Sequence, residues 1–246
     1  MIREFNGIPA YVAVISAHRS DNVEHMTEMI GEATWHVPQE EMTDYLRAGA
    51  SAVGNGAKNC MPCARNPALR YCFENNVMAI QFDDDLKKCE IVDLGGNKQR
   101  VTGTEIIEQM VTRLDRSDYK LAGVAPTPNA YFTNKRSSTN LFVIGSAIAI
   151  KPCGLLFDER FKLKSDYDYT MQHITNFGGV LRCDDLLLTF EHYSNDGGCE
   201  AYRNDEINGA MVDLLMEKWP GWFRLNPRRP GEVIMKVPKR KREYVS

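Results

Sequence analysis

The chain has 246 residues, of which 43% are hydrophobic, 26% charged and 9% aromatic. This composition excludes a disordered, collagen-like or coiled-coil protein, and the length is enough for one large domain without stabilising disulfides. No run of 18 apolar residues occurs, so we expect no membrane contact. The N-terminal segment lacks the apolar stretch of a secretory signal, and the seven cysteines favour reduced thiols, so we predict a cytoplasmic protein.

The net charge of −3 is unevenly distributed along the chain. Residues 224–246, here called the basic extension, carry eight Lys or Arg and two Glu, whereas residues 1–223 carry 22 basic and 31 acidic side chains. A basic segment on an acidic body indicates a polyanionic partner, with nucleic acid as the first candidate. A solvated terminus is the alternative. We therefore predict one domain over residues 1–223 followed by this extension.

Apolar runs and amphipathic segments alternate along the chain. The run at 11–16 predicts a strand buried on both faces, and further strands are expected at 33–37, 50–53, 77–82, 141–150 and 180–190. Helices are expected at 23–30, from Pro38, and at 67–74, 104–114, 165–177 and 201–218. This alternation predicts an α/β fold with a mostly parallel central sheet flanked by helices, and ligands at the carboxyl ends of its strands.

Three acidic residues follow the predicted strand at 77–82. Asp83, Asp84 and Asp85, here called the first acidic turn, would repel one another and have raised pKa values without a cation. Mg²⁺ or Mn²⁺ bound by such carboxylates together with substrate phosphates would relieve this. A charged turn between two strands is the alternative reading.

Two further motifs add candidate site residues. Asp166 and Asp168 open the helix expected at 165–177, where an N-capping role is the alternative. His192 follows the last apolar run, at a strand end where we expect a site.

These motifs, taken in order, resemble the GT-A nucleotide-sugar glycosyltransferases, whose fold is related to the Rossmann fold. The resemblance covers roughly residues 8–195 and rests on the strand at 11–16, Ala64-Arg65-Asn66, the acidic turn, Gly145-Ser146, Phe157-Asp158-Glu159 and Ser165-Asp166-Tyr167-Asp168. Within this class the chain looks most like the TET-associated glycosyltransferases of bacteriophages, from the segments VAVISAHRS, ARNPALRYC, QFDDD, SDYDYTMQHI and EHYSNDGGCEAYR. Those proteins are thought to glycosylate hydroxymethylated pyrimidines in DNA, which for a phage protein implies the host cytoplasm.

The resemblance implies a role for each matching position. The UDP-sugar donor would be bound by Ser16, His18, Arg19, Arg65, Asp83 and Asp84. The divalent metal would be held by Asp85, His192 and Asp83. Asp166 would be the general base that deprotonates the acceptor hydroxyl, and Asp168 would orient it or bind the acceptor.

A DNA acceptor would add contacts outside the cavity, because a base must leave the duplex to reach a deep pocket. Phosphate contacts are expected from Lys135, Arg136, Arg228, Arg229, Lys239, Arg240, Lys241 and Arg242. The first two lie in the long polar segment 125–140, which reads as a binding loop. Tyr131, Phe132, Trp219 and Trp222 are candidates for stacking on a base, although the two tryptophans are better explained by packing of the last helix.

Cys60 and Cys63 form a C-x-x-C motif with three open readings: a loop, a zinc site or a redox pair at a helix start. The function predicted from the whole sequence is a metal-dependent glycosyltransferase acting from a UDP-sugar on 5-hydroxymethylcytosine, rather than 5-hydroxymethyluracil, in DNA. A glycosyltransferase with a protein or glycan acceptor, and a non-catalytic nucleic-acid-binding protein on this fold, are the alternatives.

Overall fold

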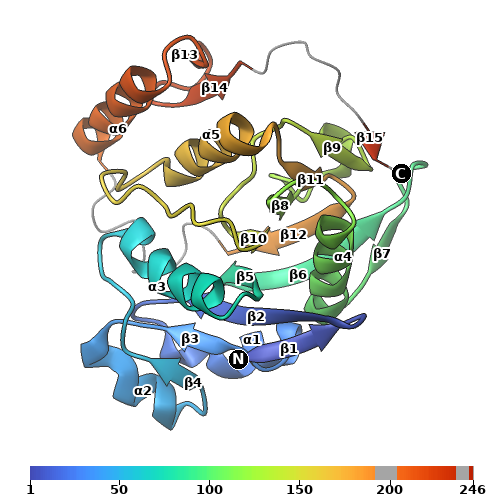
Figure 1. The fold of residues 1–246 in the computed structure, drawn as a ribbon, viewed down its shortest axis with the longest axis vertical. Coiled ribbons are helices and arrows are strands. Elements are labelled where there is room, and N and C mark those ends of the chain that lie inside the picture. The colour runs from blue at the N-terminus through green and yellow to red at the C-terminus, as the bar shows by residue number, and fades with distance from the viewer. Residues whose placement is uncertain (192–203, 237–243, 246) are drawn as a thin grey trace.

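The computed structural model describes residues 1–191, 204–236, 244 and 245. A ten-stranded sheet forms the centre of this part of the chain (Figure 1). Its spatial order is β15 (Tyr244–Val245), β9 (Ser137–Thr139), β11 (Leu181–Cys183), β8 (Leu121–Val124), β10 (Ala147–Ile150), β5 (Met78–Asp83), β2 (Ile8–Ile15), β3 (Thr34–His36) and β4 (Ser51–Val53), with β1 (Ile2–Phe5) paired to β2. Only β1, β9 and β10 of these described strands run against the others, which confirms the predicted α/β fold with a mostly parallel central sheet.

A second sheet contains β12 (Leu186–Phe190), β6 (Leu86–Val92) and β7 (Lys98–Arg100). The first acidic turn joins β5 directly to β6. Asp184 and Asp185, here called the second acidic turn, join β11 to β12 in the same way. The single strand predicted over 180–190 is therefore two strands that belong to different sheets.

Helices cover both faces of the main sheet. The described helices are α1 (Val23–Ile30), α2 (Met42–Arg47), α3 (Met61–Glu74), α4 (Gly103–Asp115), α5 (Ser165–Phe177) and α6 (Asp205–Lys218), with short 3-10 turns at Ser20–Asn22, Gln39–Glu41 and Ala130–Phe132. None of them is both long enough and apolar enough to cross a membrane.

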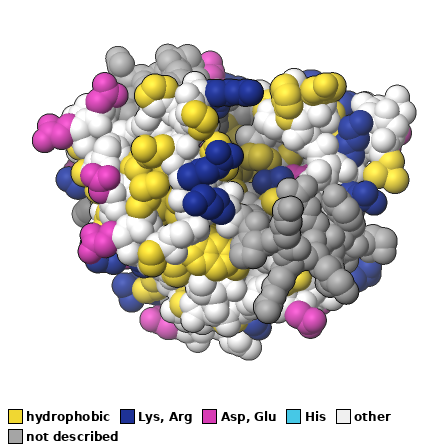
Figure 2. All heavy atoms as spheres, turned by 90° about the horizontal axis from the view of Figure 1, so that it is seen from above, with side chains coloured by type: hydrophobic (Ala, Val, Ile, Leu, Met, Phe, Trp, Pro, Cys, Tyr) yellow, Lys and Arg dark blue, Asp and Glu magenta, His cyan; other side chains and the backbone are white. Residues whose placement is uncertain are grey.

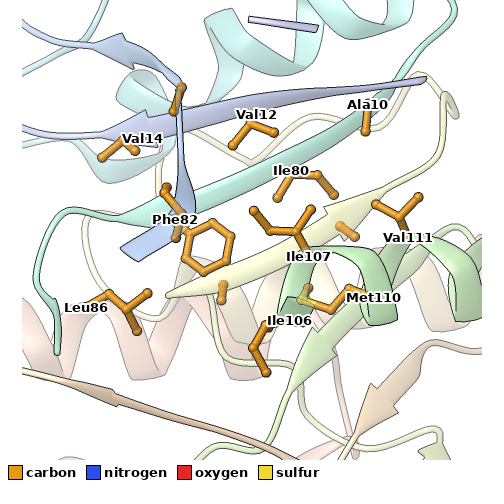
Figure 3. Close-up of a cluster of buried hydrophobic side chains, with 14 of the residues drawn as sticks. Ala10, Val12, Val14, Ile80, Phe82, Leu86, Ile106, Ile107, Met110 and Val111 are labelled. Carbon is orange, nitrogen blue, oxygen red and sulfur yellow. The ribbon is translucent and has the colours of Figure 1, made fainter. Parts of the chain in front are cut away.

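The core explains why β2 and β5 are apolar throughout. Val12, Val14, Ile80 and Phe82 face the apolar side of α4, as Figure 3 shows. The alternate residues of the same strands, such as Ala13 and Ala79, pack on the other face with side chains of α3 and α5. Because successive strand residues point to opposite faces, a strand covered on both sides must be apolar at every position.

The C-terminal part of the described chain forms a small unit of its own. Helix α6 packs with the hairpin of β13 (Phe223–Leu225) and β14 (Val233–Met235), at the top of Figure 1. Leu215 and Phe223 from this unit join Phe161 and Met171 in one buried cluster, and both tryptophans pack against it. The predicted boundary at residue 223 falls inside β13, so residues 224–236 belong to the folded body and are not a separate tail.

Two predicted segments differ in a way that matters for the site. The helix predicted at 67–74 begins earlier, at Met61, because Cys60 caps it: the Cys63 backbone N–H donates to the Cys60 sulfur. The strand predicted at 141–150 forms only over Ala147–Ile150. Residues 142 and 144–146 line a cavity instead.

Candidate functional site

A cavity of about 490 Å³ lies at the carboxyl ends of β2 and β5. At this point the strand order changes direction, since β3 and β4 follow on one side of β2 and β5 lies on the other. Open α/β sheets bind their ligands at such switch points. Residues from 15–19, 57–61, 83–85, 142–146 and 162–167 line the cavity, together with Asn208 and Glu232 of the C-terminal unit.

Asp84, which follows β5, contacts the loop that follows β2. Ser16 donates to its Oδ2, and Arg19 Nη1 lies 2.8 Å from its Oδ1. Burial raises the pKa of Asp84, and Arg19 opposes this shift. Both carboxylate oxygens are used within the protein, so Asp84 fixes the loop after β2. Asp84 also lines the cavity, so its contact with the donor stays a prediction.

Asp83 is held by an arginine from the helix on the opposite wall. Arg65 Nη2 donates to Asp83 Oδ1 at 2.5 Å, and Arg65 Nη1 lies 3.4 Å from Gln81 Oε1. Gln81 in turn donates to the Arg65 carbonyl oxygen at 2.9 Å. Arg65 is only 3% exposed, although it lines the cavity. The structure thus brings these two predicted donor-binding residues together.

Asp85 is buried beside the other two carboxylates. Burial, followed by the charges of Asp83 and Asp84, raises its pKa to about 7, and Arg19 at 3.5 Å acts in the opposite direction. Three carboxylates thus lie close together in this turn, and repulsion between them contributes to the raised pKa of Asp85. A divalent cation suits such a group of carboxylate oxygens.

The described residues do not by themselves form a metal site. In residues 1–191, 204–236, 244 and 245, no group of three or more His, Cys, Asp or Glu is arranged to hold a metal. His192, the predicted third ligand, lies outside these described residues. The metal site at Asp83, Asp85 and His192 thus remains a prediction.

Asp166 lies in the first turn of α5 and also lines the cavity. Its carboxylate accepts hydrogen bonds from the backbone N–H groups of Tyr167, at 3.0 Å, and Gly145. Burial raises the pKa of Asp166, and Arg65 lowers it. Gly145 lies between these two side chains: a Cβ there would be 3.5 Å from Asp166 Cβ and 3.6 Å from Arg65 Nη2. A carboxyl with a raised pKa in a cavity is a candidate acid or base.

Asp168 lies away from the cavity, against the end of α6. Its side chain is fully buried and receives hydrogen bonds from Trp219 Nε1 and Gln172 Nε2, both at 2.8 Å. Lys218 Nζ lies 2.7 Å from the same carboxylate. Asp168 does not line the cavity and instead ties α5 to the end of α6, which corrects its predicted catalytic role.

Glu41 holds the loop after β2 in place through contacts with His18. The His18 backbone N–H donates to Glu41 Oε2 at 2.6 Å, and His18 Nδ1 lies 2.9 Å from Oε1. Lys58 Nζ lies 3.0 Å from the same oxygen. Ser16, in turn, is 2.6 Å from the Tyr45 hydroxyl. Among the residues predicted to bind the donor in this loop, His18 has the most exposed side chain, at 50%.

Several cavity residues were missed by the sequence analysis. They are Lys58, Phe142, Lys162, Lys164, Tyr167, Asn208 and Glu232. Lys164 Nζ lies 3.1 Å from Glu232 Oε2 and so joins the start of α5 to the C-terminal unit. Phe142 and Tyr167 stack with ring centroids 4.0 Å apart. Tyr167 lies within the Ser165–Asp168 motif, but the other residues come from distant segments and match no local motif, so no sequence signal could have grouped them.

The predicted DNA-binding residues that the structure describes, Lys135, Arg136, Arg228 and Arg229, do not line the cavity. Arg136, Arg228 and Arg229 are exposed, and Lys135 lies against the turn at Gly96. Figure 2 looks onto the end of the molecule with α6, β13 and β14; Lys and Arg side chains gather near its middle. Residues 239–242 lie outside the described residues. Tyr131 and Phe132 are 85% and 71% exposed.

The fold and the site together define an α/β protein with an acid-rich cavity at the switch point of its sheet. No protein-family model matches the chain, and no curated protein matches it. A solved structure of CMP:2-keto-3-deoxy-manno-octonic acid synthetase in complex with CTP matches with 8% identity and a TM-score of 0.42. The match covers 83% of this chain and 99% of that chain.

Proposed function

We propose that this chain is a metal-dependent glycosyltransferase of the GT-A type. It would move a sugar from a UDP-sugar to the hydroxymethyl group of a modified pyrimidine in DNA, 5-hydroxymethylcytosine before 5-hydroxymethyluracil. One observation carries the proposal: Asp166 and the first acidic turn line the same cavity, with Arg65 and Gly145 between them. Transfer needs a donor-binding group and a base on either side of one reacting carbon, and the shared cavity supports these two roles.

Donor binding falls to the wall formed by β2, β5 and α3. Arg65, already fixed by Asp83 and Gln81, would contact the diphosphate, and His18 would lie near the nucleoside. Asp85 and Asp83 would hold a Mn²⁺ or Mg²⁺ ion, because their crowded carboxylates need a cation. That ion would neutralise the charge on the diphosphate leaving group.

Asp166 would act as the general base. Its carboxylate is fixed by two backbone N–H groups, and its raised pKa increases its affinity for the proton of the acceptor hydroxyl. Proton transfer to a positioned side chain contributes about 10²- to 10⁴-fold to the rate. The loss of that proton would accompany attack on an oxocarbenium-like anomeric carbon.

The acceptor would enter from the side of the C-terminal unit. Phe142 and Tyr167 provide an aromatic platform there, and Asn208 and Glu232 provide polar groups. A flipped pyrimidine is recognised by stacking and by hydrogen bonds to its edge, which suits this mixture. Lys135, Arg136, Arg228, Arg229 and residues 239–242 would contact phosphates outside the cavity.

The test is a donor and acceptor panel. The protein is incubated with Mn²⁺, a set of UDP-sugars and DNA containing 5-hydroxymethylcytosine or 5-hydroxymethyluracil, and the DNA is digested to nucleosides for mass spectrometry. We expect a hexose- or pentose-shifted nucleoside that Asp166→Asn abolishes while UDP binding is retained. No shifted nucleoside with any donor would refute the DNA acceptor. Donor hydrolysis alone would then favour a protein or glycan acceptor, and DNA binding alone a non-catalytic protein.

A further inference from the structure

We propose that Cys60 and Cys63 form a redox-active pair in the wall of the cavity. Their disulfide would exchange with an external dithiol, and its oxidised form would hold the cavity segment 57–61 in the shape that binds the donor. The redox activity of the pair is argued from its position in the structure alone. Its effect on nucleotide binding rests on the proposed function.

The first observation is the state of the two sulfurs. Cys60 and Cys63 are joined by a disulfide, with Cα atoms 5.2 Å apart. Cys72, Cys89, Cys153 and Cys183 are free thiols, so this is the one disulfide among the described residues. The expectation that all cysteines are reduced is thus wrong for this pair. The zinc reading of the motif also loses support, since the described residues supply no further ligands.

The second observation is the position of the pair at the start of a helix. Cys60 is the N-cap of α3, and its sulfur lies 3.3 Å from the Cys63 backbone nitrogen, which donates to it. Free N–H groups and the helix dipole at this end stabilise a thiolate, which is the species that attacks and leaves in exchange. Both cysteines are partly exposed, so a dithiol can reach them. The redox reading of the motif required such a helix start, and the structure provides it.

Three of the four free thiols among the described residues have the opposite environment. Cys72, Cys89 and Cys183 are buried, and burial raises their pKa values to about 12, 12 and 11. Buried neutral thiols exchange slowly because little thiolate is present and access is blocked. They are therefore internal controls for any labelling of the pair.

The exchange itself balances without a further reactant. A thiolate of the external dithiol attacks one sulfur of the pair, forms a mixed disulfide and releases the other cysteine as a thiolate. The second external thiol then attacks the mixed disulfide and leaves as a cyclic disulfide. Two electrons pass to the protein, the dithiol is oxidised, and both cysteines take up a proton to become thiols.

The pair is placed to influence the cavity. Cys60 and Met61 line it, and Arg65, which binds Asp83, lies in the following turn of the same helix. Asn66 anchors this part of α3 by exchanging hydrogen bonds with the Phe157 backbone, at 3.0 and 2.9 Å. Reduction would release the segment before this anchor while leaving the helix in place. We expect the cavity wall, rather than the fold, to respond.

The first experiment is a redox titration of the full chain. The protein is equilibrated in buffers of reduced and oxidised dithiothreitol, the free thiols are alkylated under native conditions, and peptides are quantified by mass spectrometry. We expect Cys60 and Cys63 to titrate together as one two-electron couple, with Cys72, Cys89 and Cys183 unlabelled throughout. A pair that stays in one state across the range, or two cysteines that label independently, would overturn the redox site.

The second experiment measures UDP binding by calorimetry in the oxidised and reduced proteins. Coupling between two sites typically changes affinity by about 5- to 150-fold, and we expect about tenfold weaker binding after reduction. By linkage, saturating UDP then stabilises the oxidised pair tenfold relative to the reduced pair, so it should lower the reduction potential of the pair by about 30 mV. Equal affinity in both states, or no UDP binding in either, would overturn the effect on the cavity.

Variants separate this inference from a loss of folding. Cys60→Ser/Cys63→Ser should bind UDP like the reduced protein and ignore dithiothreitol, whereas Cys153→Ser should still respond like the parent chain. Neither the redox titration nor the UDP-binding measurement depends on sugar transfer. A negative result in the donor panel would therefore not contradict the redox site. Conversely, transfer that is independent of redox state would leave the proposed function intact and refute the coupling.

Discussion

The two acidic turns of this protein look alike in sequence but do different things. Each follows a strand of the main sheet and leads into a strand of the second sheet, β5 to β6 and β11 to β12. In the second turn, Arg113 forms a two-pronged pair with Asp185 at 2.7 and 2.8 Å, and Arg182 lies 2.7 Å from Asp184. Ser138 and Asn134 also donate to Asp184.

The first turn faces a cavity, and one of its carboxyl groups has a raised pKa. Arg65 and Arg19 bind Asp83 and Asp84, but Asp85 keeps a raised pKa. The second turn lines no part of that cavity. An acidic run after a strand therefore does not define a candidate site by itself; the first turn differs from the second in lining the cavity and in the raised pKa of Asp85.

The largest expected effect is on transfer. Asp85→Asn should reduce metal-stimulated sugar transfer on the order of 100-fold, or about 2.7 kcal/mol in activation free energy, because the leaving-group charge loses its cation. Steady-state rates at a series of Mn²⁺ concentrations check this. Asp185→Asn is the matched control and should keep its rate per folded molecule. Equal losses in the two variants would remove the distinction between the turns.

For folding stability we expect the reverse: Asp185→Asn should have the larger effect and Asp85→Asn the smaller. Asp185→Asn leaves the partly buried Arg113 with one prong of its pair weakened and should lower the free energy of unfolding by about 1–3 kcal/mol. Asp85→Asn relieves repulsion within the first turn and should leave the metal-free protein as stable as before or more so. Urea denaturation in the presence of EDTA measures both. A large destabilisation by Asp85→Asn would mean that this turn, too, is structural.

The pH dependence of stability follows from the raised pKa of Asp85. In the metal-free folded protein this pKa is about 7, above the unfolded value of about 3.9, so the folded state binds the proton more tightly. The resulting stabilisation is complete below about pH 4 and is lost as the pH rises through about 7. Denaturation series from pH 4 to 8 should show this decline in the parent chain and a flatter curve for Asp85→Asn. Identical slopes would argue against the raised pKa.

The smallest effect concerns the basic extension. Removing residues 239–242 should weaken DNA binding and reduce its salt dependence by up to about 0.9 in log–log slope for each lost phosphate contact. Donor hydrolysis at the first acidic turn should not change. Filter binding at several salt concentrations checks this. An unchanged affinity would make these residues a solvated segment without a role in binding.

Much of the site could be predicted because its parts are local. The apolar runs of β2 and β5 are visible in the sequence, since both faces of these strands are buried, and acidic residues directly after β5 must lie at its carboxyl end. The start of α5 at Ser165 was also predicted correctly, which brought Asp166 into the candidate site.

The contacts between distant segments decided the rest. Asp166 and Asp168 are two residues apart, and a helix turns by about 200° over that distance, so one faces the cavity and the other α6. The sequence could not say which, because that depends on where α6 packs. Likewise, Glu232 reaches the cavity only because the β13–β14 hairpin folds onto α6. The sequence by itself determined the strands, the helices and the charges they carry; only the tertiary structure decided which charges were compensated and which faced open space.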